Sequence, residues 1–104
     1  MSFLLLYVTH PSRPEAVRLS TELLRQRFIA CVNYIPIDST YWWQGELQSS
    51  SEILTIYKTR KENHEKVREF IESAHIYDTP CIIRLAEVTA NEGYEEWIQK
   101  EIIS

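Results

Sequence analysis

Two long strand-like segments, residues 30–43 and 46–59, meet at the dipeptide Gln44-Gly45. A glycine beside a polar residue, between two β-rich runs, is typical of a tight hairpin turn. Arms of about 14 residues, at about 3.3 Å per residue, reach roughly 46 Å. The first apolar run, "FLLLYVT" at residues 3–9, is much shorter. The hairpin is therefore expected to project beyond the core of its own domain.

Three aromatic residues, Tyr41, Trp42 and Trp43, come just before the turn. Neighbouring residues of a strand face opposite sides, so Tyr41 and Trp43 share one face and Trp42 takes the other. Helices packed on one face of a sheet cannot cover all three rings. Exposed aromatic area of this kind usually marks an interface, and we expect it between subunits. The alternative is that a bulge near Pro36 and the serines at 49–51 fold the tip back onto its own subunit.

Two predicted helices each begin with a capping box. In "SRPE", Ser12 is placed to accept a hydrogen bond from a backbone N–H while Glu15 reaches back. Thr59 and Glu62 have the same spacing ahead of the second helix, which is expected to end near His75. Apolar residues recur at helical spacing after both boxes.

The remaining chain completes an alternating order of strands and helices. Residues 80–88 predict a fourth strand that begins at a proline, and Asn91 is expected to cap a last short helix. The order β-α-β-β-α-β with a terminal helix is that of an α+β, ferredoxin-like fold. We expect residues 1–104 to form one such domain.

Two cysteines, Cys31 and Cys81, fall on the second and fourth predicted strands. The ferredoxin-like order places these strands at opposite edges of the sheet. A disulfide requires Cα atoms within about 7 Å of each other, so we expect none between these two residues. Their low density also differs from that of a secreted disulfide scaffold.

Charge and hydropathy disfavour several classes of protein. The 15 acidic and 11 basic residues give a net charge of −4 with mixed signs, which does not suit a nucleic-acid partner. No apolar run approaches the roughly 20 residues that cross a bilayer. "MSFLLLYVTH" lacks the basic segment and cleavage site of a signal peptide, so a cytoplasmic location is expected. No nucleophile-and-base spacing or phosphate-binding glycine loop predicts an enzyme.

Five motifs carry a resemblance to a known family. In chain order they are "ACVN", "STYWWQGE", "KT", "HIYDTP" and "YEEW". Together they resemble the CutA family, the divalent-cation tolerance proteins. The resemblance implies a homotrimer joined through long hairpins, in which Tyr41, Trp42 and Trp43 lie at the trimer interface. It also implies an architecture similar to that of PII-type signalling proteins, and an association with copper and other divalent cations.

The resemblance also implies functional residues at matching positions. The family's metal-associated cysteine and histidine correspond to Cys31 and His75. The motif departs from the family pattern at Ile76, at Asp78 and at Cys81, and Cys81 is a further candidate sulfur ligand that would need contact across subunits. The cleft between subunits corresponds to four residues: Trp43, Glu52, Lys58 and Tyr77.

Structural roles stay open for the same side chains. Cys31 fits a small buried side chain, and His75 fits a cation at a helix end. Lys58, which comes just before a predicted helix, either receives an anionic group or pairs with a carboxylate such as that of Glu52. Solvated surface positions are expected for the other two histidines: His10 and His64.

Three functional hypotheses follow from these observations. The first is a homotrimer that binds copper or another divalent cation through a thiolate and an imidazole, a donor pair that suits Cu(I), Cu(II) and Zn(II). The second is a PII-like sensor, in which a small ligand in the intersubunit cleft changes the binding of an unidentified protein partner. The third is a trimeric scaffold whose aromatic hairpin serves assembly alone.

Overall fold

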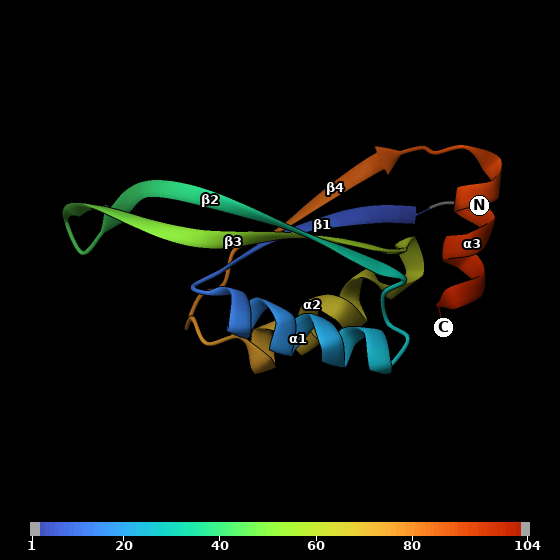
Figure 1. Cartoon of the computed structure of the whole chain (residues 1–104), viewed down its shortest axis with the longest axis horizontal. Helices are drawn as coiled ribbons and strands as arrows, with labels where there is room; N and C mark the ends of the chain where they lie inside the picture. The colour runs from blue at the N-terminus through green and yellow to red at the C-terminus, as the bar shows by residue number, and fades with distance from the viewer. Residues whose placement is uncertain (1–2, 103–104) are drawn as a thin grey trace.

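The four strands form one antiparallel sheet in the order β2-β3-β1-β4 (Figure 1). The computed structural model describes residues 3–102, so the ends of the expected 1–104 domain lie outside the described residues. This arrangement confirms the predicted α+β, ferredoxin-like order with a terminal helix. The elements are β1 (Phe3–His10), α1 (Arg13–Arg25), β2 (Cys31–Trp43), β3 (Glu46–Arg60), the short 3-10 helix η1 (Lys61–Asn63), α2 (His64–Ala74), β4 (Ile82–Val88) and α3 (Glu92–Glu101).

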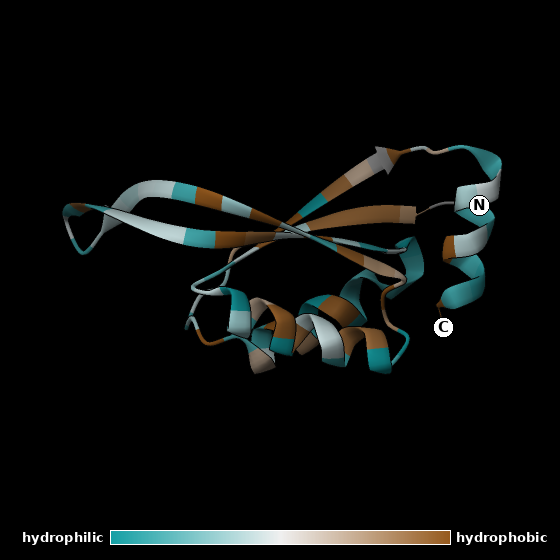
Figure 2. Cartoon of the chain, in the orientation of Figure 1, coloured by the Kyte–Doolittle hydropathy of each residue, from teal (hydrophilic) through white to brown (hydrophobic). Residues whose placement is uncertain are grey.

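Helices α1 and α2 cover one face of the sheet (Figure 1), and the main core lies between these helices and the sheet. Strand β1 is apolar along most of its length (Figure 2), and Leu4, Leu6 and Val8 point alternately into this core. The opposite face is covered at one end by α3, which packs Ile98 against Phe3. Beyond α3 this second face, called here the open face, exposes several apolar side chains: Ile35, Ile83 and Leu85.

The β2–β3 hairpin projects past the rest of the domain (Figure 1). Gln44 and Gly45 have φ angles of 49° and 80°, as a two-residue type I′ turn requires. The longest axis of the chain measures 45 Å, close to the length expected for the hairpin arms. At the tip Trp42 is 72% exposed and Trp43 58% exposed. The tip therefore does not fold back onto its own subunit, and the predicted projection is confirmed.

The helix starts follow the sequence signals only in part. Ser12 Oγ accepts a hydrogen bond from the Glu15 N–H at 3.3 Å, which confirms the cap of α1. The second capping box is wrong: Thr59 still belongs to β3, and its hydroxyl donates to the Phe28 carbonyl at 2.6 Å. Helix α2 starts only after η1. Asn91 precedes α3 as expected, but its backbone carbonyl, rather than its side chain, accepts hydrogen bonds from the first turn.

Replacing Ser12 by alanine is expected to lower the free energy of unfolding by about 1 kcal/mol, because α1 loses its N-terminal acceptor. Urea unfolding at one fixed protein concentration measures the change. Ser12→Asp is the matched control, since aspartate also accepts from this N–H and should keep most of the stability. Equal losses in both variants would contradict a capping role.

Within residues 3–102, the helices are all too short or too polar to cross a membrane.

Candidate functional site

A cavity of about 660 Å³ opens between the base of the hairpin and the segment that joins α2 to β4. We call it the hairpin pocket. Side chains of the open face, from β1, β2 and β3, form its floor, because residues paired across antiparallel strands point to the same side. Its lining comprises Thr9, Ser39, Tyr41, Trp43, Gln48, Glu52, Ile76, Tyr77, Asp78, Thr79 and Cys81. Three of the four predicted cleft residues therefore lie together.

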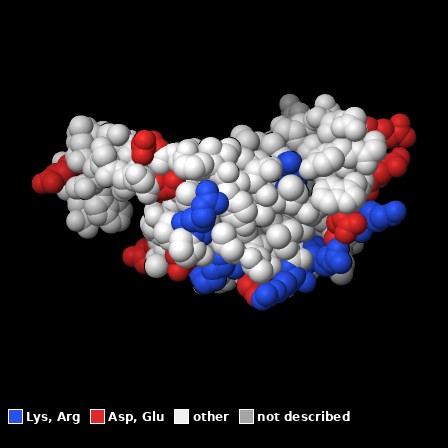
Figure 3. Space-filling view, in the orientation of Figure 1, with Lys and Arg blue, Asp and Glu red and all other residues white. Residues whose placement is uncertain are grey.

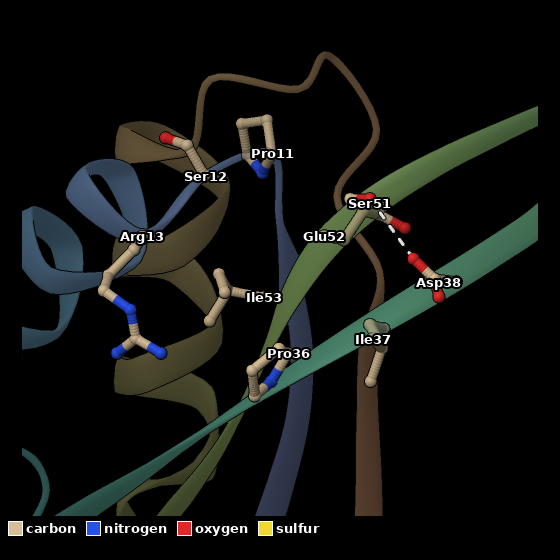
Figure 4. A pocket seen from close by; sticks show the side chains of 9 residues that line it. All are labelled: Pro11, Ser12, Arg13, Pro36, Ile37, Asp38, Ser51, Glu52 and Ile53. Atoms are coloured by element: carbon tan, nitrogen blue, oxygen red, sulfur yellow. Dashed lines mark hydrogen bonds between the residues drawn. The ribbon is translucent and has the colours of Figure 1, made fainter.

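A second, smaller pocket of about 320 Å³ lies on the opposite side of the hairpin base (Figure 4). It is bounded by the start of α1 and by both hairpin strands, where Ser51 Oγ donates to Asp38 Oδ1 at 3.2 Å. Glu52 lines both pockets. Glu52 therefore lies between the two pockets, and its carboxylate bonds to Tyr77 of the hairpin pocket.

Tyr77 and Glu52 are joined by a hydrogen bond in the lining of the hairpin pocket. The Tyr77 hydroxyl donates to Glu52 Oε2 at 2.7 Å, although the two residues lie far apart in sequence. Burial, and then the bonded carboxylate, raise the pKa of Tyr77 well above its usual range, so the phenol keeps its proton. Only 9% of Glu52 is exposed. The segment after α2 is thus attached directly to β3.

His75 lies where α2 ends, as expected, and both of its ring nitrogens are engaged. Nδ1 accepts a hydrogen bond from the Tyr77 N–H at 3.0 Å. Nε2 lies 2.8 Å from the Thr9 carbonyl, so this nitrogen carries the proton and donates it. The two bonds fix the ring between β1 and the segment that leads to Cys81. Sequence analysis identified the residue but not these partners.

His10 is the residue that sequence analysis placed wrongly. It is only 1% exposed, and its ring stacks on that of His75 with the centroids 5.0 Å apart. Nε2 contacts the hydroxyls of Thr55 at 2.9 Å and Tyr57 at 3.3 Å. Burial, followed by the neighbouring His75, lowers the pKa of His10 to about 4. The signal was present: His10 continues the alternation that buries Leu4, Leu6 and Val8. His64 is also less exposed than expected and contacts the carboxylate of Glu65 at 3.2 Å.

The chain does not bring Cys31 and His75 together. Cys31 pairs with Lys58, which pairs in turn with Leu5 of β1. His75 instead bonds to Thr9, four residues further along β1, or roughly 13 Å at the usual rise of a strand. Any site that contains both side chains requires a second subunit.

Cys81 and His75 both lie near Thr9. Cys81 lines the hairpin pocket together with Thr9, whose backbone carbonyl accepts the hydrogen bond from His75. Both cysteines are free thiols, as predicted. Burial, and then the nearby Glu52, raise the pKa of Cys81. Cys31 begins β2 and Cys81 precedes β4, at opposite edges of the sheet as predicted, so a site that holds both thiols still requires contact across subunits.

Lys58 does not share the hairpin pocket. It donates to the Tyr94 hydroxyl at 3.0 Å, and its ammonium lies 5.2 Å from the centre of that ring. The hydrogen bond to Tyr94 is the main cause of the raised pKa of Lys58. Glu52 bonds to Tyr77 instead, so the expected Lys58–Glu52 ion pair is wrong.

The donor set of one chain suits weak cation binding. Carboxylates of Glu52 and Asp78 and the thiol of Cys81 line the same pocket. Across residues 3–102, however, no three His, Cys, Asp or Glu side chains converge closely enough to hold a metal ion. A structural zinc site needs four such ligands, and a catalytic one needs three. A tight metal site must therefore be completed by donors from outside the chain.

Comparison with known proteins agrees with the five motifs. Residues 4–101 match the family described as CutA1 divalent ion tolerance protein. Over 97 residues the chain is 36% identical to the divalent-cation tolerance protein CutA of Archaeoglobus fulgidus. The matched region covers 93% of this chain and 95% of the relative. The corresponding protein of Pyrococcus horikoshii is 36% identical over 98 residues, or 94% of this chain and 96% of the relative.

Solved structures of these relatives have the same fold. CutA1 from Pyrococcus horikoshii superposes with a TM-score of 0.94 at 35% identity, over 97% of this chain and 99% of the other. CutA1 from Oryza sativa gives 0.95 at 33% identity, over 100% of this chain and 96% of the other. The resemblance drawn from the motifs is confirmed. The chain belongs to the CutA1 divalent ion tolerance protein family.

Proposed function

We propose that this protein is a homotrimer that binds copper or another divalent cation and contributes to cation tolerance. The observation that carries the proposal is the placement of His75 and Cys81 near Thr9, which supplies an imidazole and a thiol, while residues 3–102 form no complete metal site of their own. Cys31, far away in the same subunit, becomes the donor that a neighbouring subunit contributes. Thiolate and imidazole ligands together suit copper and zinc.

Assembly is supported by the surface of the single chain. Trp42, Trp43 and Leu47 expose most of their area at the hairpin tip, and the open face adds further apolar side chains. An exposed apolar surface that continues from a sheet onto a projecting ribbon marks an interface between proteins. We propose that three copies cover these surfaces for one another, in a PII-like arrangement.

Binding at His75 would change the hydrogen bonds that now hold its ring. A metal at Nε2 replaces the bond to Thr9, whereas a metal at Nδ1 replaces the bond from Tyr77. Either exchange gives up a hydrogen bond worth about 1 kcal/mol, a small cost beside coordination by a thiolate and an imidazole. Because Nδ1 accepts a hydrogen bond from the Tyr77 N–H, its lone pair is the one that a metal could use once that bond is given up.

A competition titration tests the metal site. We expect reduced protein to take Cu(I) from a chromogenic chelator at a saturable site, with affinity lowered at least about tenfold in Cys31→Ser, His75→Ala and Cys81→Ser, because each variant removes a ligand. His64→Ala is the matched control and should bind like wild type. Light scattering on the same samples confirms whether the oligomer persists. Weak Cu(I) binding that is the same in wild type and all three variants would overturn the proposal. If only Cys81→Ser keeps the wild-type affinity, Cys81 is not a ligand but the other two residues still are.

The compartment follows from the thiols. The rice relative is named a chloroplastic protein, and the Archaeoglobus structure is named periplasmic. For this chain we propose the cytoplasm, because a reducing compartment keeps Cys31 and Cys81 free to bind metal.

A second candidate function is favoured by the hairpin pocket. Its volume of about 660 Å³ lies in the range of small-molecule sites, and Trp43, Glu52 and Tyr77 converge on it. In a sensor, a small ligand held there would change how the hairpin presents itself to another protein. A thermal-shift screen separates the two functions, since stabilisation by metals alone disfavours the sensor.

A further inference from the structure

We propose that the hairpin pocket binds an organic cation, an ammonium group carried on a small apolar body. The inference rests on the proposed sensor function of this pocket and names the chemical class of its ligand. Three features carry it: a carboxylate without an ion-pair partner among the described residues, the absence of basic residues from the lining, and a set of aromatic rings in the lining.

The carboxylate of Glu52 is the first feature. The Glu52 residue is only 9% exposed and lines the pocket, and its carboxylate accepts a hydrogen bond from Tyr77. Among the described residues, none makes an ion pair with it. The hydrogen bond from Tyr77 comes from a neutral phenol and brings no positive charge to this carboxylate. A cation that enters the pocket would supply the missing charge.

The charge of the surroundings is the second feature. Asp78 adds another carboxylate to the lining, which contains no lysine or arginine. Residues 31–57, which include most of the hairpin, contain no lysine or arginine either. In Figure 3 the projecting hairpin at the left carries acidic atoms and no basic ones, whereas the body of the domain carries both signs. The field in the pocket therefore favours cations and opposes phosphates and carboxylates.

The aromatic rings are the third feature, and they select the kind of cation. Tyr41, Trp43 and Tyr77 all line the pocket, and their faces attract a positive charge by cation–π interaction. An inorganic divalent ion prefers oxygen, nitrogen or sulfur ligands at short distances and keeps its water. An alkylammonium group is weakly hydrated and can lie against the rings while its charge faces Glu52 and Asp78. The smaller pocket offers no comparable set of rings.

Choline and its neutral isostere 3,3-dimethyl-1-butanol provide the test. Isothermal titration calorimetry of the full, metal-free protein should show saturable binding of choline. The uncharged alcohol, of nearly equal shape, should bind about tenfold more weakly, since it lacks the cation–π and carboxylate attraction. Equal affinity for the two compounds, or no binding of choline, would overturn the proposal.

Variants locate the binding. Asp78→Asn and Glu52→Gln each remove one charge while keeping shape, and the amide oxygen at position 52 can still accept from Tyr77. Each is expected to weaken choline about fivefold, as for other single partly desolvated charges. Glu46→Gln, at the exposed hairpin tip and outside the pocket, is the matched control and should bind normally.

The outcomes distinguish this inference from the functions it builds on. If a neutral or anionic metabolite stabilises the protein in the thermal-shift screen while choline does not bind, the sensor function stands and the organic cation fails. If choline binds only after the oligomer has been dissociated, a neighbouring subunit occupies the pocket, and the proposal fails. The Cu(I) titration is unaffected by either result, because the tested charges are not among its proposed ligands.

Discussion

Acidifying the metal-free protein from pH 6.5 to pH 4 is expected to lower its free energy of unfolding by about 3 kcal/mol through His10 alone. The imidazole has its ordinary pKa of 6.5 in the unfolded chain and a pKa of about 4 in the fold. Between these values the unfolded state binds more protons than the folded state. Stability due to His10 is therefore complete above pH 6.5, falls as the pH drops, and falls no further below about pH 4.

The physical cause is the packing around the ring. The Thr55 hydroxyl donates to the Val8 carbonyl, so its oxygen is left to accept a proton from His10 Nε2. On the other side the ring stacks on His75. Burial lowers the pKa of His10 most, followed by the neighbouring His75, and Arg18 lowers it slightly. Glu15 raises this pKa, but by less than burial lowers it. A second proton would place a positive charge on a buried ring beside His75, and this cost favours the neutral form.

His10→Gln isolates this contribution. Glutamine does not titrate, and its amide can still donate to the Thr55 hydroxyl. Urea unfolding with EDTA, at one protein concentration, is measured at several values between pH 6.5 and 4. Titration of the carboxylates changes the free energy of unfolding equally in both proteins. Between pH 6.5 and 4 this free energy should therefore fall by about 3 kcal/mol more in the wild type than in the variant. Parallel curves for the two proteins would show that His10 titrates normally in the fold.

Much of the fold follows from local patterns. The Gln44-Gly45 turn, the long arms and the first apolar strand each depend on neighbours in sequence, and each is confirmed. Ser12 is confirmed for the same reason, because its partner lies in the first turn of α1. Thr59 has the same spacing to an acidic residue, but pairing between β3 and β1 extends through it, so the strand overrides the cap.

Side-chain partners were harder to predict, because they depend on the path of the segment after α2. That segment brings His75, Tyr77 and Cys81 to β1 and β3, where they meet Thr9 and Glu52. No local signal specifies how a short irregular connection turns. The partner of Lys58 was missed for a similar reason. Lys58 bonds to Tyr94 on α3, and the spacing of residues along β3 does not say where the terminal helix packs.

Trp42→Ala is expected to raise the dissociation constant of the proposed trimer by more than about a hundredfold. Trp42 is 72% exposed in the single chain and pairs across the hairpin with Leu47, which is also exposed. A tryptophan buried at the centre of an interface typically contributes about 2 kcal/mol or more per copy, or roughly thirtyfold, and three copies act together. Sedimentation over a range of protein concentrations measures the change.

The control for this prediction is Trp97→Ala. Trp97 is likewise an exposed tryptophan, but it lies on α3 beside Tyr94, at the end of the domain away from the hairpin. Its removal should leave the oligomer unchanged. Trp42 is also the better probe than Trp43, because Trp43 lines the hairpin pocket and its loss would affect ligand and assembly together. A wild-type protein that sediments as a monomer, or a Trp42→Ala trimer as tight as wild type, would mean that the projecting hairpin has another partner.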